Sequence, residues 1–337
     1  MRPSWIGKAS RLLTEMEANQ RIRRAVGAAV SVCTIAFLVF ILLRNIDEVR
    51  EFDDCSTYLG ICAKGFFLHP VSLITQALTW RFIIMRLGRM AGSWGDIEIY
   101  SYSYLMRHLP GMIWYLAGRA AMYRRRGIRA SVALVASGLE WFLLLVAALL
   151  VYATLTITGP DVSLTSIILL AALIAATALG LRQAFSAGSR LPVPDSVRRR
   201  LAALATAPIP GCTDLVLWLS LYALAYFIGG WMLVLLVNGV APEVTLGLGT
   251  ATRIWALTGG IGSLLSAIVP AGLGIRELTL AVLLSPAMSR TGAVLVAILL
   301  RMAIIAGDLV WANALYAVAR LMRQHWQRAD LSSPNGS

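Results

Sequence analysis

Charged residues are scarce in this sequence. Only 14% of its 337 residues are Asp, Glu, Lys or Arg, whereas 58% are hydrophobic. Soluble globular domains carry roughly a quarter charged residues, because their surfaces face water. The composition therefore excludes an ordinary soluble enzyme or binding domain and indicates an integral membrane protein.

Side chains that bind metals or act as nucleophiles are also few. The three histidines, His69, His108 and His325, stand apart from one another, and the four cysteines form no CxxC motif. The sequence has no HExxH element, no nucleotide-binding glycine loop and no serine elbow. We therefore expect no metal, no cofactor and no catalytic residue. Cys55 and Cys62 lie in one predicted external loop, where a disulfide and two free thiols both fit the sequence.

Acidic residues are outnumbered by basic ones, 17 against 30, which gives a net charge of +13. A nucleic-acid partner would require a sizeable soluble basic region, and the sequence has none. Most of the basic residues instead flank apolar runs in segments that fall on one side: 1–24, 86–95, 119–130, 182–212 and 319–337. The positive-inside rule then places both termini in the cytoplasm of a multi-pass protein of the cell (inner or plasma) membrane.

Six apolar runs are long enough to cross a membrane, since a helix needs about 20 apolar residues to span about 30 Å of hydrocarbon. The runs are residues 25–43, 66–85, 131–154, 165–181, 213–238 and 292–318. We therefore predict an all-α polytopic membrane protein with six transmembrane helices, a cytoplasmic basic N-terminus (1–24) and a cytoplasmic tail (319–337).

A seventh apolar segment, residues 96–123, is interrupted at Pro110-Gly111. Each half has about a dozen residues and reaches only about 18 Å, which is too short to cross. We predict a re-entrant helical hairpin that enters from the cytoplasm. Its broken backbone must be buried in protein or line a polar cavity.

An eighth segment, residues 246–289, is interrupted at Pro270, Gly272 and Gly274, and both of its flanks are predicted to be external. It predicts a second hairpin that enters from the opposite face. Residues 246–269 are also long enough to cross fully, so a complete span stays the alternative there.

The order of these segments predicts an inverted repeat, a plan found in many secondary transporters. The first membrane repeat covers residues 25–164 and the second covers 165–318. Glu140 and Arg301 follow the proline of their respective hairpins by 30 and 31 residues, so opposite charges occupy equivalent places. We expect both side chains to face one central cavity near the middle of the bilayer and to pair with each other.

The interruptions place charged side chains at membrane depth, where each costs about 2.5–3.5 kcal/mol to insert. Arg276 and Glu277 follow the second break at a restarting helix, whose free N–H groups favour an anion. Glu277 either compensates the helix dipole or acts as a protonatable or cation-coupling group. Arg107, His108 and Arg119 surround the first break as candidate ligands for a phosphate on the cytoplasmic side. The alternative for Arg119 is an interfacial anchor, together with the arginines of 124–129.

Two further features lack an assigned role. Asp308 follows Arg301 by seven residues and so lies on the same helix face, without an evident partner. Several aromatic residues flank the first break, and we favour an interfacial aromatic belt for them over a place in the site. They are Tyr100, Tyr102, Tyr104, Trp114 and Tyr115.

The segments "HLPGMIWYLAGRAAMYRRRG" and "VPAGLGIRELTLAVLL" resemble the membrane domain of the lysylphosphatidylglycerol synthase family, also called flippase-like or UPF0104 proteins. The resemblance covers nearly the whole chain. It rests on a Leu-Pro-Gly hairpin leading to Gly-Arg and on a Pro-x-Gly-x-Gly-x-x-Glu element. The matching residues are Leu109, Pro110, Gly111, Gly118 and Arg119, then Pro270, Gly272, Gly274 and Glu277.

This resemblance implies a stand-alone membrane domain that moves a lipid with a polar headgroup between leaflets, without the family's soluble aminoacyltransferase domain. The implied cargo has an anionic or phosphate-linked headgroup. We expect the substrate site to consist of Arg107, Pro110, Gly111, Arg119, Glu140, Pro270, Gly272, Gly274, Arg276, Glu277 and Arg301.

Our leading hypothesis is a lipid flippase or transporter in which Arg119 and Arg276 engage a phosphate headgroup while Glu140, Glu277 and Arg301 gate the cavity. One alternative is a membrane-embedded transferase acting on a lipid phosphate, with Glu140 or Glu277 as base. Another is a non-catalytic membrane partner of a glycosyltransferase or lipid-modifying enzyme, with the basic loops as its docking surface.

Overall fold

The computed structural model describes residues 55–88, 92–108, 112–159, 161–188, 209–266 and 275–332. These residues form helices and short connections, with no strand among them. Several predictions concern parts of the chain outside this description. They are the span at 25–43, the cytoplasmic N-terminus, the hairpin residues Pro110, Gly111, Pro270, Gly272 and Gly274, and the side chains of Cys55, Cys62 and His108.

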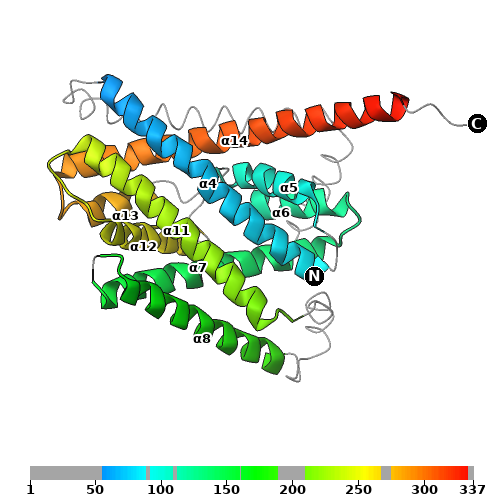
Figure 1. Ribbon diagram of the computed structural model, residues 1–337, viewed down its shortest axis with the longest axis horizontal. Helices are drawn as coiled ribbons and strands as arrows, with labels where there is room; N and C mark the ends of the chain where they lie inside the picture. Colours follow the sequence, from blue (N-terminus) through cyan, green and yellow to red (C-terminus); the bar gives the residue numbers. More distant parts are fainter. Residues whose placement is uncertain are drawn as a thin grey trace, which may run out of the picture.

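The helices keep the order of the predicted segments (Figure 1). Their bounds are α4 Cys55–Gly88, α5 Trp94–Leu105, the 3-10 helix η1 Met106–His108, α6 Met112–Arg124, α7 Ala130–Ile157, α8 Leu164–Gly188, α11 Cys212–Val240, α12 Leu248–Ser266, α13 Ile275–Leu284 and α14 Arg290–Ser332.

Within the described chain, four helices are long and apolar enough to cross a membrane: Ala130–Ile157, Leu164–Ser186, Cys212–Val240 and Arg290–Leu315. They coincide with four of the six predicted spans, so the helical structure, length and apolar character of these four segments are confirmed. The predicted span 66–85 lies within α4, a single helix of 34 residues that continues through Pro70. An all-helical membrane protein is therefore the architecture that the structure supports.

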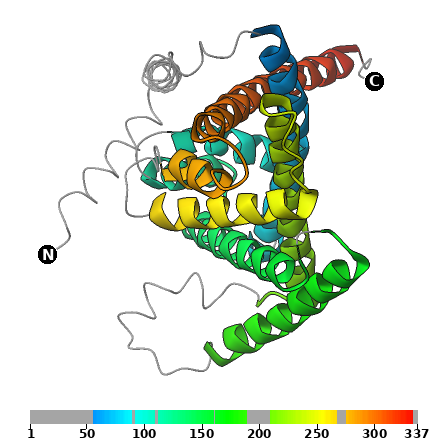
Figure 2. The same ribbon diagram turned by 90° about the vertical axis from the view of Figure 1, so that its left-hand side faces the viewer.

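Helices α4 and α11 form the long antiparallel pair around which the other helices are arranged (Figure 1). Leu236 near the end of α11 lies beside Gly65 near the start of α4. At the opposite ends, Arg86 of α4 forms an ion pair with Asp214 of α11, with 3.0 Å between Nε and Oδ2. Figure 2 shows α12 lying between α13 and α7, both of which it contacts.

Helix α8 lies at one edge of the bundle and packs on α7 and α11 (Figure 1). Its outward face carries large apolar side chains, of which Leu164 is 72% exposed and Ile168 60% exposed. In water such a face would be unfavourable by about 25 cal/mol per Å² of apolar surface. Facing lipid tails it carries no such cost, which explains why the helix retains these residues.

The short helices α5 and α6 pack side by side and antiparallel. Asp96, at the start of α5, is fully buried. Its carboxylate accepts the backbone N–H of Ser93 at 2.9 Å and the hydroxyl of Tyr123, near the end of α6, at 3.2 Å. Arg126 Nη1, just beyond α6, lies 3.5 Å from the same carboxylate. Asp96 thus joins the start of α5 to the end of α6.

Helices α11 and α12 approach closely at Gly229 and Gly230. A Cβ atom on Gly230 would lie only 2.6 Å from the Cα atom of Thr252 in α12, and one on Gly229 would overlap the indole of Trp255. Because backbone cannot move aside as a flexible side chain can, Gly230 sets the distance between these two helices.

We expect Gly230→Ala to lower the free energy of unfolding by about 1–3 kcal/mol through overpacking. Gly180→Ala, in the exposed face of α8, is the matched control, because a Cβ atom there meets nothing within 4 Å. It should be neutral or slightly stabilising, since alanine is the better helix former. Unfolding in detergent micelles measures both variants, and equal stability of the two would contradict this assignment.

Candidate functional site

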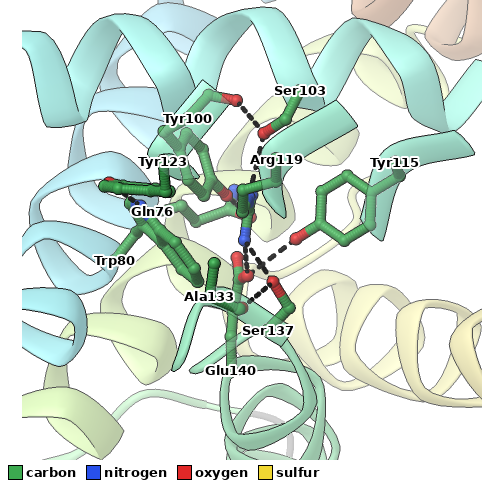
Figure 3. A network of polar contacts seen from close by, with 10 residues as sticks. All are labelled: Gln76, Trp80, Tyr100, Ser103, Tyr115, Arg119, Tyr123, Ala133, Ser137 and Glu140. Atoms are coloured by element: carbon green, nitrogen blue, oxygen red, sulfur yellow. Dashed lines mark hydrogen bonds and ion pairs between the residues drawn. The ribbon is translucent and has the colours of Figure 1, made fainter. Parts of the chain in front are cut away.

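Arg119 of α6 is among the largest fully buried side chains of the described protein, with 0% exposure. Its Nη1 forms a short ion pair with Glu140 Oε2 of α7, and its Nε donates to Ser103 Oγ of α5 at 2.9 Å. The hydroxyl of Tyr115 donates to the same Glu140 oxygen at 2.7 Å. Figure 3 shows these side chains converging from three helices.

Aromatic rings enclose the Arg119 guanidinium. Its Cζ atom lies 3.8 Å from the ring centroid of Trp80, 4.3 Å from that of Tyr115 and 5.0 Å from that of Tyr100. A buried cation is tolerated only when its charge is compensated, and here a carboxylate and three π faces compensate it. Arg119 is thus neutralised inside the protein.

The predicted interfacial aromatic belt is wrong for Tyr100, Tyr104 and Tyr115, because each is buried. Trp114, by contrast, is 37% exposed. The alternative of an interfacial anchor for Arg119 is also excluded, because its side chain is enclosed by protein. The sequence does not reveal that the Arg119 guanidinium packs against Tyr100 and Tyr115 inside the protein.

A cavity of about 200 Å³ lies beside this network, between the helices of both halves of the chain. Its lining includes charged side chains and a histidine from α4, η1, α7, α13 and α14. They are His69, Arg107, Glu140, Arg276, Glu277, Arg301 and Asp308. Tyr115 and Glu140 form the part of the wall behind which Arg119 lies.

The cavity brings together five of the predicted site residues: Arg107, Glu140, Arg276, Glu277 and Arg301. The predicted pairing of Glu140 with Arg301 is wrong, because each has another partner. Glu140 pairs with Arg119, and Arg301 Nη1 lies 3.3 Å from Glu277 Oε1. Each glutamate pairs with the arginine that helix packing places beside it. The spacing of these residues along the sequence does not reveal that packing.

Arg107 and Arg276 have a different environment from Arg119 and Arg301. The Arg107 guanidinium stacks 3.9 Å above the ring centroid of Tyr104, and Arg276 Nη2 donates to Ser263 Oγ at 3.3 Å. Among the residues that the structure describes, no carboxylate forms an ion pair with either arginine. Both side chains are half-buried and line the cavity.

Gly262 of α12 lets Arg276 reach this position. A Cβ atom there would overlap Cγ of Arg276 and lie 2.6 Å from its Nε. The small residue therefore leaves room for the arginine stem between α12 and α13. Sequence analysis assigned Gly262 no such role, since the contact joins two helices across an interruption of the chain.

The pair of His69 in α4 and Asp308 in α14 was not predicted. Their Nε2 and Oδ1 atoms lie 2.6 Å apart, and both side chains line the cavity. Asp308 could be singled out because it shares a helix face with Arg301, but its partner lies 239 residues away in the sequence. Only the packing of α4 on α14 reveals the contact.

Comparison of the chain with protein-family models, with curated proteins and with solved structures finds no match. In the described chain, no group of three or more His, Cys, Asp or Glu side chains is arranged to hold a metal ion. The side chains of the cavity offer arginine donors to an anion.

We expect Glu140→Leu to lower the free energy of unfolding by about 3–5 kcal/mol, because it leaves the Arg119 cation buried without its carboxylate. Adding Arg119→Met to this variant should recover a large part of the loss, since the double variant buries no charge. Unfolding in mixed detergent micelles measures both.

Arg86→Gln provides the control for this cycle. It breaks the ion pair with Asp214, in which the arginine side chain is 47% exposed, and should cost less than about 1 kcal/mol. A double variant that is no more stable than Glu140→Leu would contradict the role of charge burial.

Proposed function

We propose that the protein moves a lipid with a phosphate-bearing headgroup between the two leaflets of a cell membrane. The observation that carries this proposal is the pair of cavity-lining arginines, Arg107 and Arg276, that have no carboxylate partner in the described chain. A cation at membrane depth is costly unless an anion compensates it. Phosphate oxygens suit guanidinium groups, which donate several parallel hydrogen bonds.

The headgroup ligands in this proposal differ from those expected from the sequence. Arg119 is already compensated by Glu140, so its charge is not free for a ligand. Arg107, which stacks on Tyr104, replaces Arg119 as the second headgroup ligand beside Arg276. A site between these two arginines receives one side chain from each half of the chain.

The size of the cavity fits a headgroup and not a whole lipid. Pockets that enclose drug-sized ligands measure about 300–1,000 Å³, whereas this cavity measures about 200 Å³. The acyl chains then stay in the bilayer while the headgroup passes through the protein. This division suits a lipid transporter, because only the headgroup is insoluble in hydrocarbon.

The ion pairs support the inverted repeat that this proposal includes. In the first half, an arginine of the short helix α6 pairs with a glutamate of the following long helix α7. In the second half, a glutamate of the short helix α13 pairs with an arginine of the following long helix α14. Each pair therefore joins a short helix to the long helix that follows it, with the two charges exchanged between the halves. Two hairpins related by an inverted repeat would place Arg119–Glu140 and Glu277–Arg301 in equivalent positions.

The Glu277–Arg301 pair is the movable element of this proposal. Both side chains are slightly exposed to the cavity, 15% and 13%, whereas Arg119 is sealed. A phosphate entering the cavity competes with Glu277 for Arg301. Binding of the headgroup thus weakens the contact between α13 and α14, which gives the site a means of changing shape.

The function is tested with purified protein in vesicles that contain acyl-chain-labelled phosphatidylglycerol, whose leaflet distribution is read by quenching the label from outside. The protein should accelerate exchange of the label between leaflets relative to protein-free vesicles. No acceleration together with no lipid binding would overturn the proposal. Co-purification with an enzyme, combined with full tolerance of Arg276→Gln, would instead favour the membrane-partner hypothesis.

We expect Arg107→Gln and Arg276→Gln each to weaken binding of a short-chain phosphatidylglycerol about tenfold or more, because a hydrogen bond to a charged group contributes about 1.5–3 kcal/mol. Arg182→Gln, at the exposed end of α8, removes the same charge away from the cavity and is the matched control. Calorimetric titration in detergent measures the three affinities. Equal weakening by all three would indicate a general effect of charge and not a site.

A further inference from the structure

His69 and Asp308 form a buried polar pair that joins α4 to α14 at the wall of the cavity. Their side chains are 7% and 1% exposed, and the Nε2–Oδ1 distance of 2.6 Å is that of a strong hydrogen bond. The imidazole packs directly on Gly307, where a Cβ atom would lie 2.6 Å from His69 Cδ2. The glycine before Asp308 therefore lets α4 and α14 approach closely enough to form the pair.

The contact fixes which imidazole nitrogen is free. An ionised carboxylate only accepts hydrogen bonds, so Nε2 of His69 must carry the hydrogen that it donates to Asp308. Nδ1 is then the basic nitrogen, able to accept a second proton. The pair carries one negative charge before that proton is added and none afterwards.

The other charged and titratable groups of the cavity do not offer this change. Tyr104 and Arg107 come from α5 and η1, Tyr115 from α6, Glu140 from α7, Tyr226 from α11, Arg276 and Glu277 from α13, and Arg301 from α14. Arginine and tyrosine ordinarily keep one charge state through the neutral range. The two glutamates are each held by an arginine. His69 is the imidazole among them, the side chain that ordinarily changes charge between about pH 5 and 8.

We propose that the His69–Asp308 pair is a proton-binding site and that the protein takes up a proton there when the anionic headgroup enters the cavity. This inference rests on the proposed function, since it requires an anionic ligand in the same cavity. A phosphate near Arg107 and Arg276 adds negative charge to the cavity that His69 also lines. A nearby negative charge favours the protonated imidazole over the neutral one.

The coupling works in both directions because binding free energies are reciprocal. If the headgroup favours the protonated pair, then protonation must favour the headgroup by the same factor. Lower pH on one side of the membrane would therefore load the cavity from that side, and higher pH on the other side would release the lipid. A proton gradient would thus drive lipid movement through the protonation of His69.

The test is calorimetric titration of the full-length protein in detergent with dihexanoyl phosphatidylglycerol between about pH 5.5 and 8.5. The probe is a phosphodiester, whose own charge is constant over that range. We expect the affinity for this lipid to rise as the pH falls, by at most about tenfold per pH unit, because one proton is coupled to binding. Repeating one titration in buffers of different protonation enthalpy should show net proton uptake on binding.

His69→Gln should abolish both the pH dependence and the proton uptake, because glutamine keeps a donor for Asp308 but accepts no proton in this range. Asp308→Asn is the second variant, expected to reduce both effects by removing the charge that stabilises the imidazolium. Asp214→Asn, in the exposed pair with Arg86, is the matched control and should leave both unchanged. A monodisperse elution profile establishes that each variant is folded.

Three outcomes would overturn the coupling, and they differ in what else they overturn. Binding that is equally tight at every pH, or pH dependence that persists in His69→Gln, would contradict proton binding at this pair while leaving the lipid site intact. Absence of binding at any pH in the unaltered protein would overturn the proposed function and this inference together.

Discussion

The ion pair between Arg119 and Glu140 is the contact on which the first half of the protein depends. It joins α6 to α7, and through Ser103 and Trp80 it also reaches α5 and α4. A guanidinium in a low-dielectric interior is costly unless its charge is compensated, so each of these helices is held to the position that supplies a partner. An apolar core of similar volume would impose no such directional requirement.

The charged side chains around the cavity are compensated to different degrees. Next to the sealed Arg119 stand Arg107 and Arg276, two half-buried cations that no carboxylate of the described chain pairs. Between these extremes, Glu277 and Arg301 form a pair that is slightly open to the cavity. The cavity therefore lies beside one sealed ion pair, one ion pair that is slightly exposed and two arginines without a carboxylate partner in the described chain.

Much of the helical architecture follows from local sequence. Apolar runs near 131–154 and 213–238 became α7 and α11, because a continuous stretch of about 20 apolar residues has few alternatives in a membrane. The cost of burying charge also identified Arg107 and Arg301 as candidate site residues, and both line the cavity. Their partners could not be identified in this way, because an isolated sequence does not state which helices touch.

The sequence by itself determined that this is a helical membrane protein and that its few intramembrane charges are the residues of interest, since hydrophobic length and insertion cost are properties of single segments. Tertiary structure alone decided which charges are compensated in the core and which line the cavity without a carboxylate partner in the described chain. Arg119 and Arg276 look alike in sequence, each an arginine in the short helix that follows a proline-glycine break. Packing gives one a carboxylate and three aromatic rings and the other a serine and open space, because compensation is decided by neighbours in space.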